Sequence, residues 1–379
     1  MCLRPLVSLV PRRPSLRLCS SHSSHAAPVL RDLPVLAREV SAALKPQDGH
    51  VFLDMTFGSG GHTRTLLGSR ADIKVIAMDR DPVAYEKAVA LARETDFRVL
   101  PLLARFSEAP DLLRQIGVRP GQLNGVILDV GASVDQLQDA SRGFNASLEG
   151  PLDMRMDGTR FPGMATAADV INTLDTDALT KVLRSYGESK KARKIAQAIV
   201  DARFMMLSIK TTSQLVQLVT SIVSSVDWGD RSPQPTTVCD NVFRALRLFV
   251  NNELNELNYA IEKMREFLVL DPKILKVPKV DKEFLEDISS GVLAVLCTNP
   301  MEDRIVKDHV MLRSHEDPDD PYTSKSVNYL ESPTEKEMQR LMDRKWLPLE
   351  KFVLFPSEEE ILTNPTGKAT RLRCAMRRL

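Results

Sequence analysis

The stretch from Val51 to His62 reads Val-Phe-Leu-Asp-Met-Thr-Phe-Gly-Ser-Gly-Gly-His, and it decides the fold. Its first three residues form a short apolar run typical of a buried strand, which Asp54 ends. Three glycines follow and permit positive φ angles and close approach of the backbone to a ligand. They are Gly58, Gly60 and Gly61. A helix is expected at His62–Leu67. The pattern favours a turn that holds an adenosine-containing cofactor over a glycine-rich loop without a ligand.

A second strand is expected at Ile73–Met78, closed by Asp79. An acid at the tip of this strand suits hydrogen bonding to two ribose hydroxyls. The next expected elements are a helix at Pro82–Arg93, a strand at Arg98–Leu103, a helix at Pro110–Ile116 and a strand at Gly125–Val130. This alternation predicts a Rossmann-like α/β fold with a parallel sheet covered on both faces. Asp54, Asp79 and Asp129 would then share its carboxyl edge, where such sheets bind ligands.

The pattern changes after the fourth strand. Helical periodicity without a convincing strand covers Thr176–Tyr186, Lys190–Phe204 and Ser213–Val226. We therefore predict a helical domain at 135–239, inserted into a sheet domain made of 31–134 and 240–379. One long helix is expected at Phe243–Leu268, followed by strands at Gly291–Cys297 and Phe352–Phe355.

The bulk composition is that of a soluble globular chain, with 379 residues, 43% hydrophobic and 27% charged. A net charge of +1 neither indicates nor excludes a nucleic-acid partner. The five cysteines lack metal-ligand spacing, which favours a reducing compartment and no metal site. No apolar run approaches the ~20 residues that span a bilayer, so no membrane partner is expected.

The first thirty residues form a basic segment with several serines and no acid before Asp32. Its arginines are Arg4, Arg12, Arg13 and Arg17. This composition predicts a mitochondrial transit peptide at 1–30 and a location in the matrix. Prolines at 5, 11 and 14 interrupt the apolar patches, so a secretory signal fits poorly. A basic tail that targets nothing is the alternative.

Several blocks of sequence together resemble one family. The blocks are Asp54–His62, Met78–Pro82, Leu128–Gly131, Arg142–Phe144, Gly150–Asp157, Tyr186–Glu188, Arg244–Leu257, Glu302–Lys307 and Asn364–Pro365. They resemble the MraW/RsmH family of S-adenosylmethionine-dependent methyltransferases, which methylate the exocyclic N4 of a cytidine in small-subunit ribosomal RNA. With its basic tail, the chain is similar to a mitochondrial member. The resemblance implies a class I methyltransferase fold, and ribosomal RNA or an assembling ribosomal particle as the partner.

Family contacts to S-adenosylmethionine carry over to matching positions. They are Gly60, Gly61, His62, Asp79, Phe106, Asp129 and Gln136. The residue types agree for the glycine loop, because free backbone N–H groups attract the methionine carboxylate. Phe106 is equally consistent with plain core packing. Asp129 is the catalytic candidate, as an oxygen that holds the N4 hydrogens. It is also consistent with a cofactor contact or a turn cap.

The implied reaction needs positioning, because the lone pair of cytosine N4 is delocalised into the ring. The nitrogen must lie in line with the methyl group, at about 3 Å. The resemblance implies a single-stranded or flipped-out cytidine. Phosphate-contact candidates are Arg142, Arg155, Lys190 and Lys194, with Arg160, Lys191 and Arg193 beside them. The run Lys190–Lys194 is equally consistent with a solvated helix face.

Three departures from the family pattern weaken a simple transfer of activity. Asp32 stands where the family has His, and Thr237 begins a segment that replaces a His-x-Ala-Thr pattern. Asn299 and Pro300 stand where it has His and Ser. Since Asn does not titrate near neutral pH, a proton-transfer role of that His would be lost. One alternative is therefore a catalytically weak RNA-binding assembly factor. Another is a nicotinamide-dependent oxidoreductase, from the glycine loop and acid alone. The sequence does not predict the oligomeric state.

Overall fold

The computed structural model describes residues 34–187, 191–205, 208–225, 234–273, 289–310, 345–350 and 352–378. The predicted transit peptide, Asp32 and Lys190 lie outside the described residues. Within the described part, no helix is both long and apolar enough to cross a membrane.

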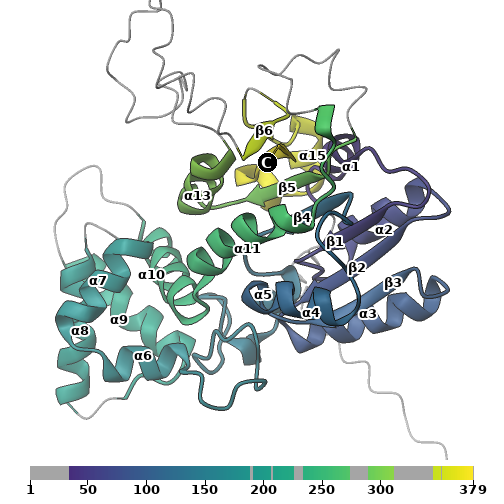
Figure 1. Ribbon diagram of the computed structural model, residues 1–379. Coiled ribbons are helices and arrows are strands. Elements are labelled where there is room, and N and C mark those ends of the chain that lie inside the picture. The colour runs from purple at the N-terminus through teal and green to yellow at the C-terminus, as the bar shows by residue number, and fades with distance from the viewer. Residues whose placement is uncertain are drawn as a thin grey trace, which may run out of the picture. The chain divides into compact units, whose positions relative to one another are not determined.

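A seven-stranded sheet organises the methyltransferase-like part, in the order β3-β2-β1-β4-β5-β7-β6 (Figure 1). Its strands are β1 (Val51–Asp54), β2 (Lys74–Asp79), β3 (Val99–Leu103), β4 (Gly125–Asp129), β5 (Val292–Cys297), β6 (Trp346–Pro348) and β7 (Arg371–Arg377). The first five strands pair in parallel, whereas β7 runs antiparallel to both β5 and β6. The predicted Rossmann-like α/β fold is confirmed, but the sheet is parallel only from β1 to β5.

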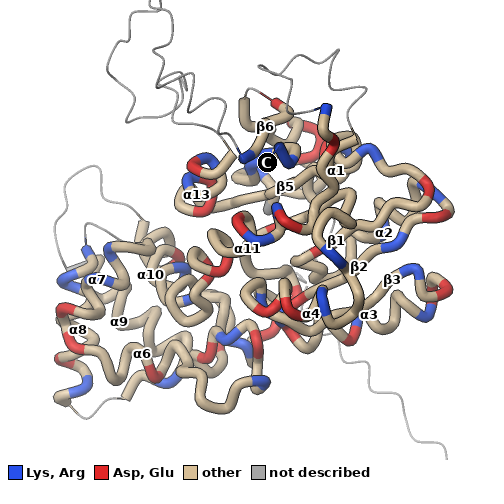
Figure 2. Tube along the Cα trace, in the orientation of Figure 1, with Lys and Arg blue, Asp and Glu red and all other residues tan. Residues whose placement is uncertain are grey.

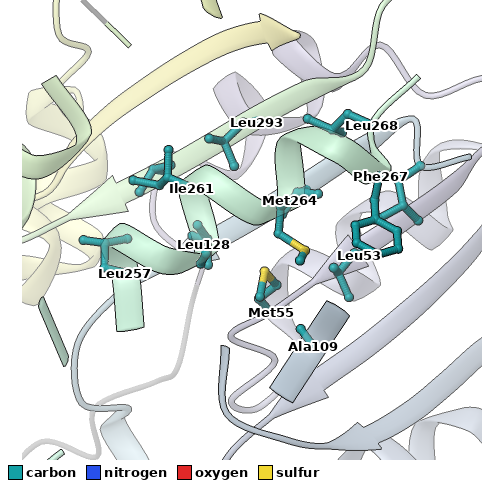
Figure 3. Packing of buried hydrophobic residues seen from close by; sticks show 14 of the residues in the cluster. Leu53, Met55, Ala109, Leu128, Leu257, Ile261, Met264, Phe267, Leu268 and Leu293 are labelled. Carbon is teal, nitrogen blue, oxygen red and sulfur yellow. The ribbon is translucent and has the colours of Figure 1, made fainter. Parts of the chain in front are cut away.

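Two apolar clusters cover the two faces of the sheet. Alternate strand residues point to opposite faces, so Phe52 joins one cluster and Leu53 the other. The first cluster includes side chains of α1 (Ala37–Leu44), α2 (Gly61–Ser69) and α3 (Pro82–Glu94). The second includes side chains of α4 (Ala109–Gln115), α11 (Glu253–Phe267) and α13 (Pro300–Val310). In Figure 3, Met264 and Phe267 of α11 lie against Leu53 in this second cluster. Helices thus cover both faces, as predicted.

A third apolar cluster belongs to the inserted helices, which Figure 1 shows grouped together in teal. They are α6 (Ala167–Thr173), α7 (Thr176–Tyr186), α8 (Ala192–Phe204), α9 (Thr212–Ser225) and α10 (Pro235–Val250). The cluster extends along α10 as far as Leu246. The domain boundary at 239 stays a prediction, although the packing of α10 favours a later one. The short helices are α5 (Val134–Gln138), η1 (Phe106–Glu108), η2 (Ala140–Arg142), α15 (Glu358–Thr363) and η4 (Pro365–Ala369).

The prediction of one long helix at Phe243–Leu268 is wrong. The helix breaks between Val250 and Glu253, where Asn252 has a left-handed φ of 52°. Asn251 lies at this break, and its Nδ2 donates hydrogen bonds to the carbonyl oxygens of Met154 (2.7 Å) and Arg247 (2.9 Å). These bonds stabilise the break, and Asn tolerates the left-handed region better than most residues. Apolar periodicity alone does not reveal such a contact.

The strand predicted at Phe352–Phe355 is also wrong. Only an isolated bridge joins Leu354 to Leu372 there, whereas the strands of this region are β6 and β7. Phe352 and Phe355 are 57% and 52% exposed, so their aromatic character does not reflect a buried strand. The β propensity of these aromatic residues predicted a strand, but their side chains do not pack as those of a buried strand would.

Candidate active site

The glycine loop between β1 and α2 is shaped by close packing. Gly60 has φ +86°, and a Cβ there would lie 2.6 Å from the ring of Phe57. A Cβ on Gly61 would lie 2.9 Å from Pro34. Both glycines are therefore required by the turn itself. Whether they also contact a cofactor stays a prediction.

Hydrogen bonds tie this loop to the ends of two strands. The buried Asp54 accepts a hydrogen bond from the Thr63 hydroxyl at 2.7 Å. Burial raises the pKa of Asp54, and the bond from Thr63 opposes that rise. The Thr56 hydroxyl accepts a hydrogen bond from the backbone N–H of Asp129 at 2.7 Å. The carboxyl ends of β1 and β4 are thus joined directly through the loop.

Asp79, at the end of β2, faces the same loop. Its Oδ2 accepts a hydrogen bond from the N–H of Gly58 at 2.8 Å, and its Oδ1 accepts one from the N–H of Asp81 at 2.9 Å. Burial raises the pKa of Asp79 to about 6. An ionised carboxylate has about four acceptor positions, so each oxygen keeps capacity for a further donor. The geometry therefore fits two ribose hydroxyls.

Asp129 and His62 lie close together at the carboxyl edge. The Nε2 of His62 is 3.5 Å from the Oδ2 of Asp129. The His62 side chain is 7% exposed, whereas that of Asp129 is 36% exposed. Asp129 is consequently the more exposed of the two side chains. The sequence-based roles of both residues stay predictions.

The η1 turn holds Phe106, which is partly buried against the second apolar cluster. Glu256 of α11 accepts hydrogen bonds from the N–H and the hydroxyl of Ser107, both at 2.8 Å. Glu108 accepts hydrogen bonds from the Arg160 guanidinium at 2.8 and 3.0 Å. Residues on both sides of the turn therefore fix its place. Core packing and an adenine contact are both compatible with this position of Phe106.

Gln136 is buried and points toward Asp81. Its Nε2 donates a hydrogen bond to the Oδ2 of Asp81 at 2.7 Å, and Arg142 donates to the same oxygen at 2.8 Å. The Oε1 of Gln136 accepts a hydrogen bond from the N–H of Ser133. These contacts bring the segment after β4 to the end of β2. The predicted cofactor contact of Gln136 is not tested by them.

The side chains predicted to contact RNA differ in how far they are buried. The Arg142 guanidinium also donates to the carbonyl oxygens of Arg155 and Met156, and the Arg155 guanidinium pairs with Asp153. Both guanidinium groups thus have partners within the protein. Lys194 lies on α8 and is exposed. Figure 2 shows basic and acidic positions interspersed along α7 and α8. Contact with RNA stays a prediction for all of them.

A buried charged group at the end of β5 escaped the sequence analysis. The Nε of Arg247 lies 2.9 Å from Glu253, and its Nη2 lies 3.8 Å from Glu302. Glu302 in turn accepts a hydrogen bond from the N–H of Asn299 at 3.2 Å, and burial raises the pKa of Glu302 to about 7. Side chains of α10, α11 and α13 therefore meet at the Arg247 guanidinium. Two of the motif blocks contain these residues, but no spacing rule pairs them.

A second group missed from the sequence surrounds Asp157. This carboxylate is fully buried and faces the side chains of Arg80, Arg105 and Arg160. Asn251 binds the same segment, since its Oδ1 accepts a hydrogen bond from the N–H of Met156 at 2.8 Å.

The described residues contain no group of three His, Cys, Asp or Glu side chains placed to hold a metal ion.

The model of the MraW methylase family matches residues 30–278. The chain belongs to the MraW methylase family. This membership confirms the resemblance seen in the motif blocks and sets aside the oxidoreductase alternative.

The matches to three relatives cover different shares of the relatives' own lengths. The human 12S rRNA N(4)-cytidine methyltransferase METTL15 is 40% identical over 91% of this chain and 82% of its own length. The ribosomal RNA small subunit methyltransferase H of Parvibaculum lavamentivorans is 39% identical over 74% of each chain. A putative receptor-type tyrosine-protein phosphatase mosPTP-1 of Culex quinquefasciatus is 37% identical over 92% of this chain. This chain spans only 22% of that last protein, so its name assigns no activity here.

Two of the departures from the MraW pattern fall on residues that the structure describes. Thr237 is exposed on the first turn of α10, and Asn299 lies between β5 and α13. The Oδ1 of Asn299 accepts a hydrogen bond from the N–H of Met301 at 3.0 Å, while its buried Nδ2 has no hydrogen-bond partner among the described residues. Asn299 thus serves at least as a helix cap.

Proposed function

We propose that this protein transfers a methyl group from S-adenosylmethionine to the N4 of a cytidine in small-subunit ribosomal RNA, in the mitochondrial matrix. The observation that carries the proposal is Asp79, whose carboxylate accepts two backbone N–H groups and keeps acceptor capacity beside the glycine loop. Family membership and the named activities of the methyltransferase relatives support the reaction. The basic composition of the first thirty residues supports the location.

Different residues at the carboxyl edge of the sheet would bind different parts of the cofactor. S-adenosylmethionine supplies an activated methyl group on a sulfonium. Asp79 would accept the ribose hydroxyls, and the loop at Gly60 and Gly61 would offer backbone N–H groups to the methionine carboxylate. Phe106 would pack beside the adenine. These roles need no rearrangement of the hydrogen bonds that fix the loop.

Asp129 would orient the reacting nitrogen. Its carboxylate is 36% exposed, and its backbone is fixed by Thr56. An oxygen at this place can accept a hydrogen bond from the N4 amino group and hold the proton that N4 loses when the new bond forms. His62, at 3.5 Å, would limit the movement of that carboxylate. The RNA contacts proposed from the sequence are Arg142, Arg155, Lys190 and Lys194.

A catalytically weak assembly factor of the same fold is the second candidate, and Asn299 is the observation that favours it. The side chain of Asn299 is 5% exposed and caps α13, so it neither titrates nor faces open solvent. A histidine role in proton transfer, if the reaction needs one, would be absent from this chain.

Methyl transfer from labelled S-adenosylmethionine to mitochondrial small-subunit RNA, followed by nucleoside analysis, separates the two candidates. We expect label in N4-methylcytidine, lost in Asp79→Ala and strongly reduced in Asp129→Asn. Asp111→Asn is the matched control, because Asp111 is 81% exposed and forms an ion pair with Arg114 in the next helical turn. Cofactor binding without label, on both free RNA and an assembling particle, would instead support the assembly factor.

A further inference from the structure

Asp157 is the most enclosed acid of the motif block Gly150–Asp157, and cofactor binding as proposed above does not use it. It has no exposed surface, and it faces the mostly buried side chains of Arg80 and Arg105. The Nε of Arg80 lies 3.1 Å from its Oδ2, and the Nε of Arg105 lies 3.1 Å from its Oδ1. The Nη1 of Arg160 follows at 3.8 Å. A buried carboxylate is stable only with such compensation.

Two of these arginines are chain neighbours of proposed cofactor contacts. Arg80 directly follows Asp79, at the end of β2, and Arg105 directly precedes Phe106, at the start of η1. The Nη1 of Arg80 also donates a hydrogen bond to the carbonyl oxygen of Asn251 at 2.9 Å. Asp157 therefore holds the side chains of the two residues that adjoin Asp79 and Phe106 in the chain.

Arg160 extends this arrangement to the far side of the η1 turn. Its guanidinium makes two hydrogen bonds to Glu108, and it also lies over the ring of Phe161, 4.8 Å from the centroid. Arg105 lies over the same ring at 3.9 Å. Two arginines and one aromatic ring thus hold both ends of the turn that carries Phe106.

The segment that contains Asp157 is hydrogen-bonded to the end of an inserted helix. Asn251, at the end of α10, binds the N–H of Met156 and the carbonyl oxygen of Met154. Met154 itself is buried with a left-handed φ of 61°, a conformation that persists only where surrounding contacts enforce it. A displacement of α10 would therefore reach Asp157 through rigid contacts.

We propose that Asp157 and Arg160 are positioning residues, through which the segment that opens the helical insertion sets the places of Asp79 and Phe106 in the cofactor site. The proposal rests on the proposed function only in taking S-adenosylmethionine as the ligand of these two residues. It predicts that cofactor affinity depends on side chains that do not touch the cofactor.

The test measures S-adenosylmethionine binding to the full chain by calorimetry without RNA, and then KM and kcat with the small-subunit RNA fragment. We expect Arg160→Gln to weaken cofactor binding about tenfold, the size of one charge-assisted hydrogen bond. The value of kcat at saturating cofactor should stay within about twofold, because the reacting groups are unaltered. Arg160→Lys should recover part of the affinity, since lysine pairs with Glu108 but not through two parallel bonds.

Matched controls separate positioning from general instability. Arg114→Gln removes an exposed ion pair with Asp111 and should leave cofactor affinity unchanged. Asp157→Asn should weaken binding more than Arg160→Gln, but it leaves two arginines without their carboxylate and can prevent folding. The Arg160 series therefore decides the question.

Two results would overturn the proposal. One is unchanged cofactor affinity in Arg160→Gln. The other is a raised KM for RNA with unchanged cofactor affinity, which would make Arg160 a phosphate contact instead. Failure of the unaltered chain to bind S-adenosylmethionine would reject the proposed function together with this proposal. Binding without methyl transfer would reject the proposed reaction alone.

Discussion

The edge of the sheet at β1, β2 and β4 differs from the edge at β5 in how it is assembled. At the first, neighbouring segments make the contacts, such as Asp79 with Gly58. At the second, Asn299 meets Glu302, which is paired with Arg247 from the inserted helices. The loop contacts of the first edge lie within residues 54–129, whereas the second edge joins two segments that are distant along the chain, at 247–253 and 299–302. Of the departures from the family pattern, Asn299 belongs to the second edge, whereas Thr237 lies exposed on α10. A turn built from nearby residues can thus be recognised in the sequence, whereas a carboxylate paired across distant segments cannot.

The largest expected effect tests the first edge. Asp79→Ala removes both proposed acceptors of the ribose hydroxyls, each worth about 2 kcal/mol as a charge-assisted hydrogen bond. We expect S-adenosylmethionine affinity to fall about a thousandfold. Calorimetric titration would check this value, with Asp111→Ala as the exposed control. A loss below tenfold would show that the ribose is not held at β2.

The contact between the insertion and the sheet edge comes next. Asn251→Ala leaves the N–H of Met156 and the carbonyl oxygen of Met154 buried without their present partners. We expect a loss of about 3 kcal/mol in the free energy of unfolding. Urea denaturation would measure it, and Asn255→Ala, on the exposed side of α11, is the comparison. Equal stability of the two variants would mean that the helix break does not depend on Asn251.

The second edge should respond to pH through Glu302. Because its pKa is raised to about 7 in the folded protein from 4.5 when unperturbed, its contribution to stability is present below pH 4.5 and is lost as pH rises through 7. Glu302→Gln has no such loss. Relative to the unaltered chain, this variant should gain roughly 2 kcal/mol between pH 5 and pH 8.

Denaturation at the two pH values gives the comparison, and Glu262→Gln on the exposed side of α11 is the control. A difference that shrinks as pH rises would contradict the buried, raised carboxyl group. Such a result would mean that the Glu302 carboxylate at the β5 edge is solvated like a group on the surface.

The smallest effect concerns Asn299. Asn299→Ala should cost about 1 kcal/mol of stability through the lost helix cap, with cofactor affinity unchanged. Thermal unfolding and calorimetry on the same sample would check both. A marked loss of cofactor affinity would show that the β5 edge and the edge at β1, β2 and β4 do not act independently.

The contrast between the edges also explains what the sequence could predict. The turn at Gly60 and the acid at Asp79 are local, so apolar runs and glycine spacing located both. The partners of Asp157 and Glu302 come from remote helices and loops, and no periodicity encodes such pairs. The single helix predicted across Asn251 failed for the same reason, because a distant segment stabilises its break.

The order of strands in the sheet places a long stretch of chain between two strands that must pair. β4 and β5 are adjacent and parallel, with Asp129 opposite Leu296, yet every inserted helix lies between them along the chain. Closing so long a loop before any contact forms is entropically costly and slow. The inserted helices have an apolar cluster of their own, which can condense from nearby segments first. Their early collapse would shorten the effective distance between the two strands, so the insertion would act as the element that lets the sheet be completed.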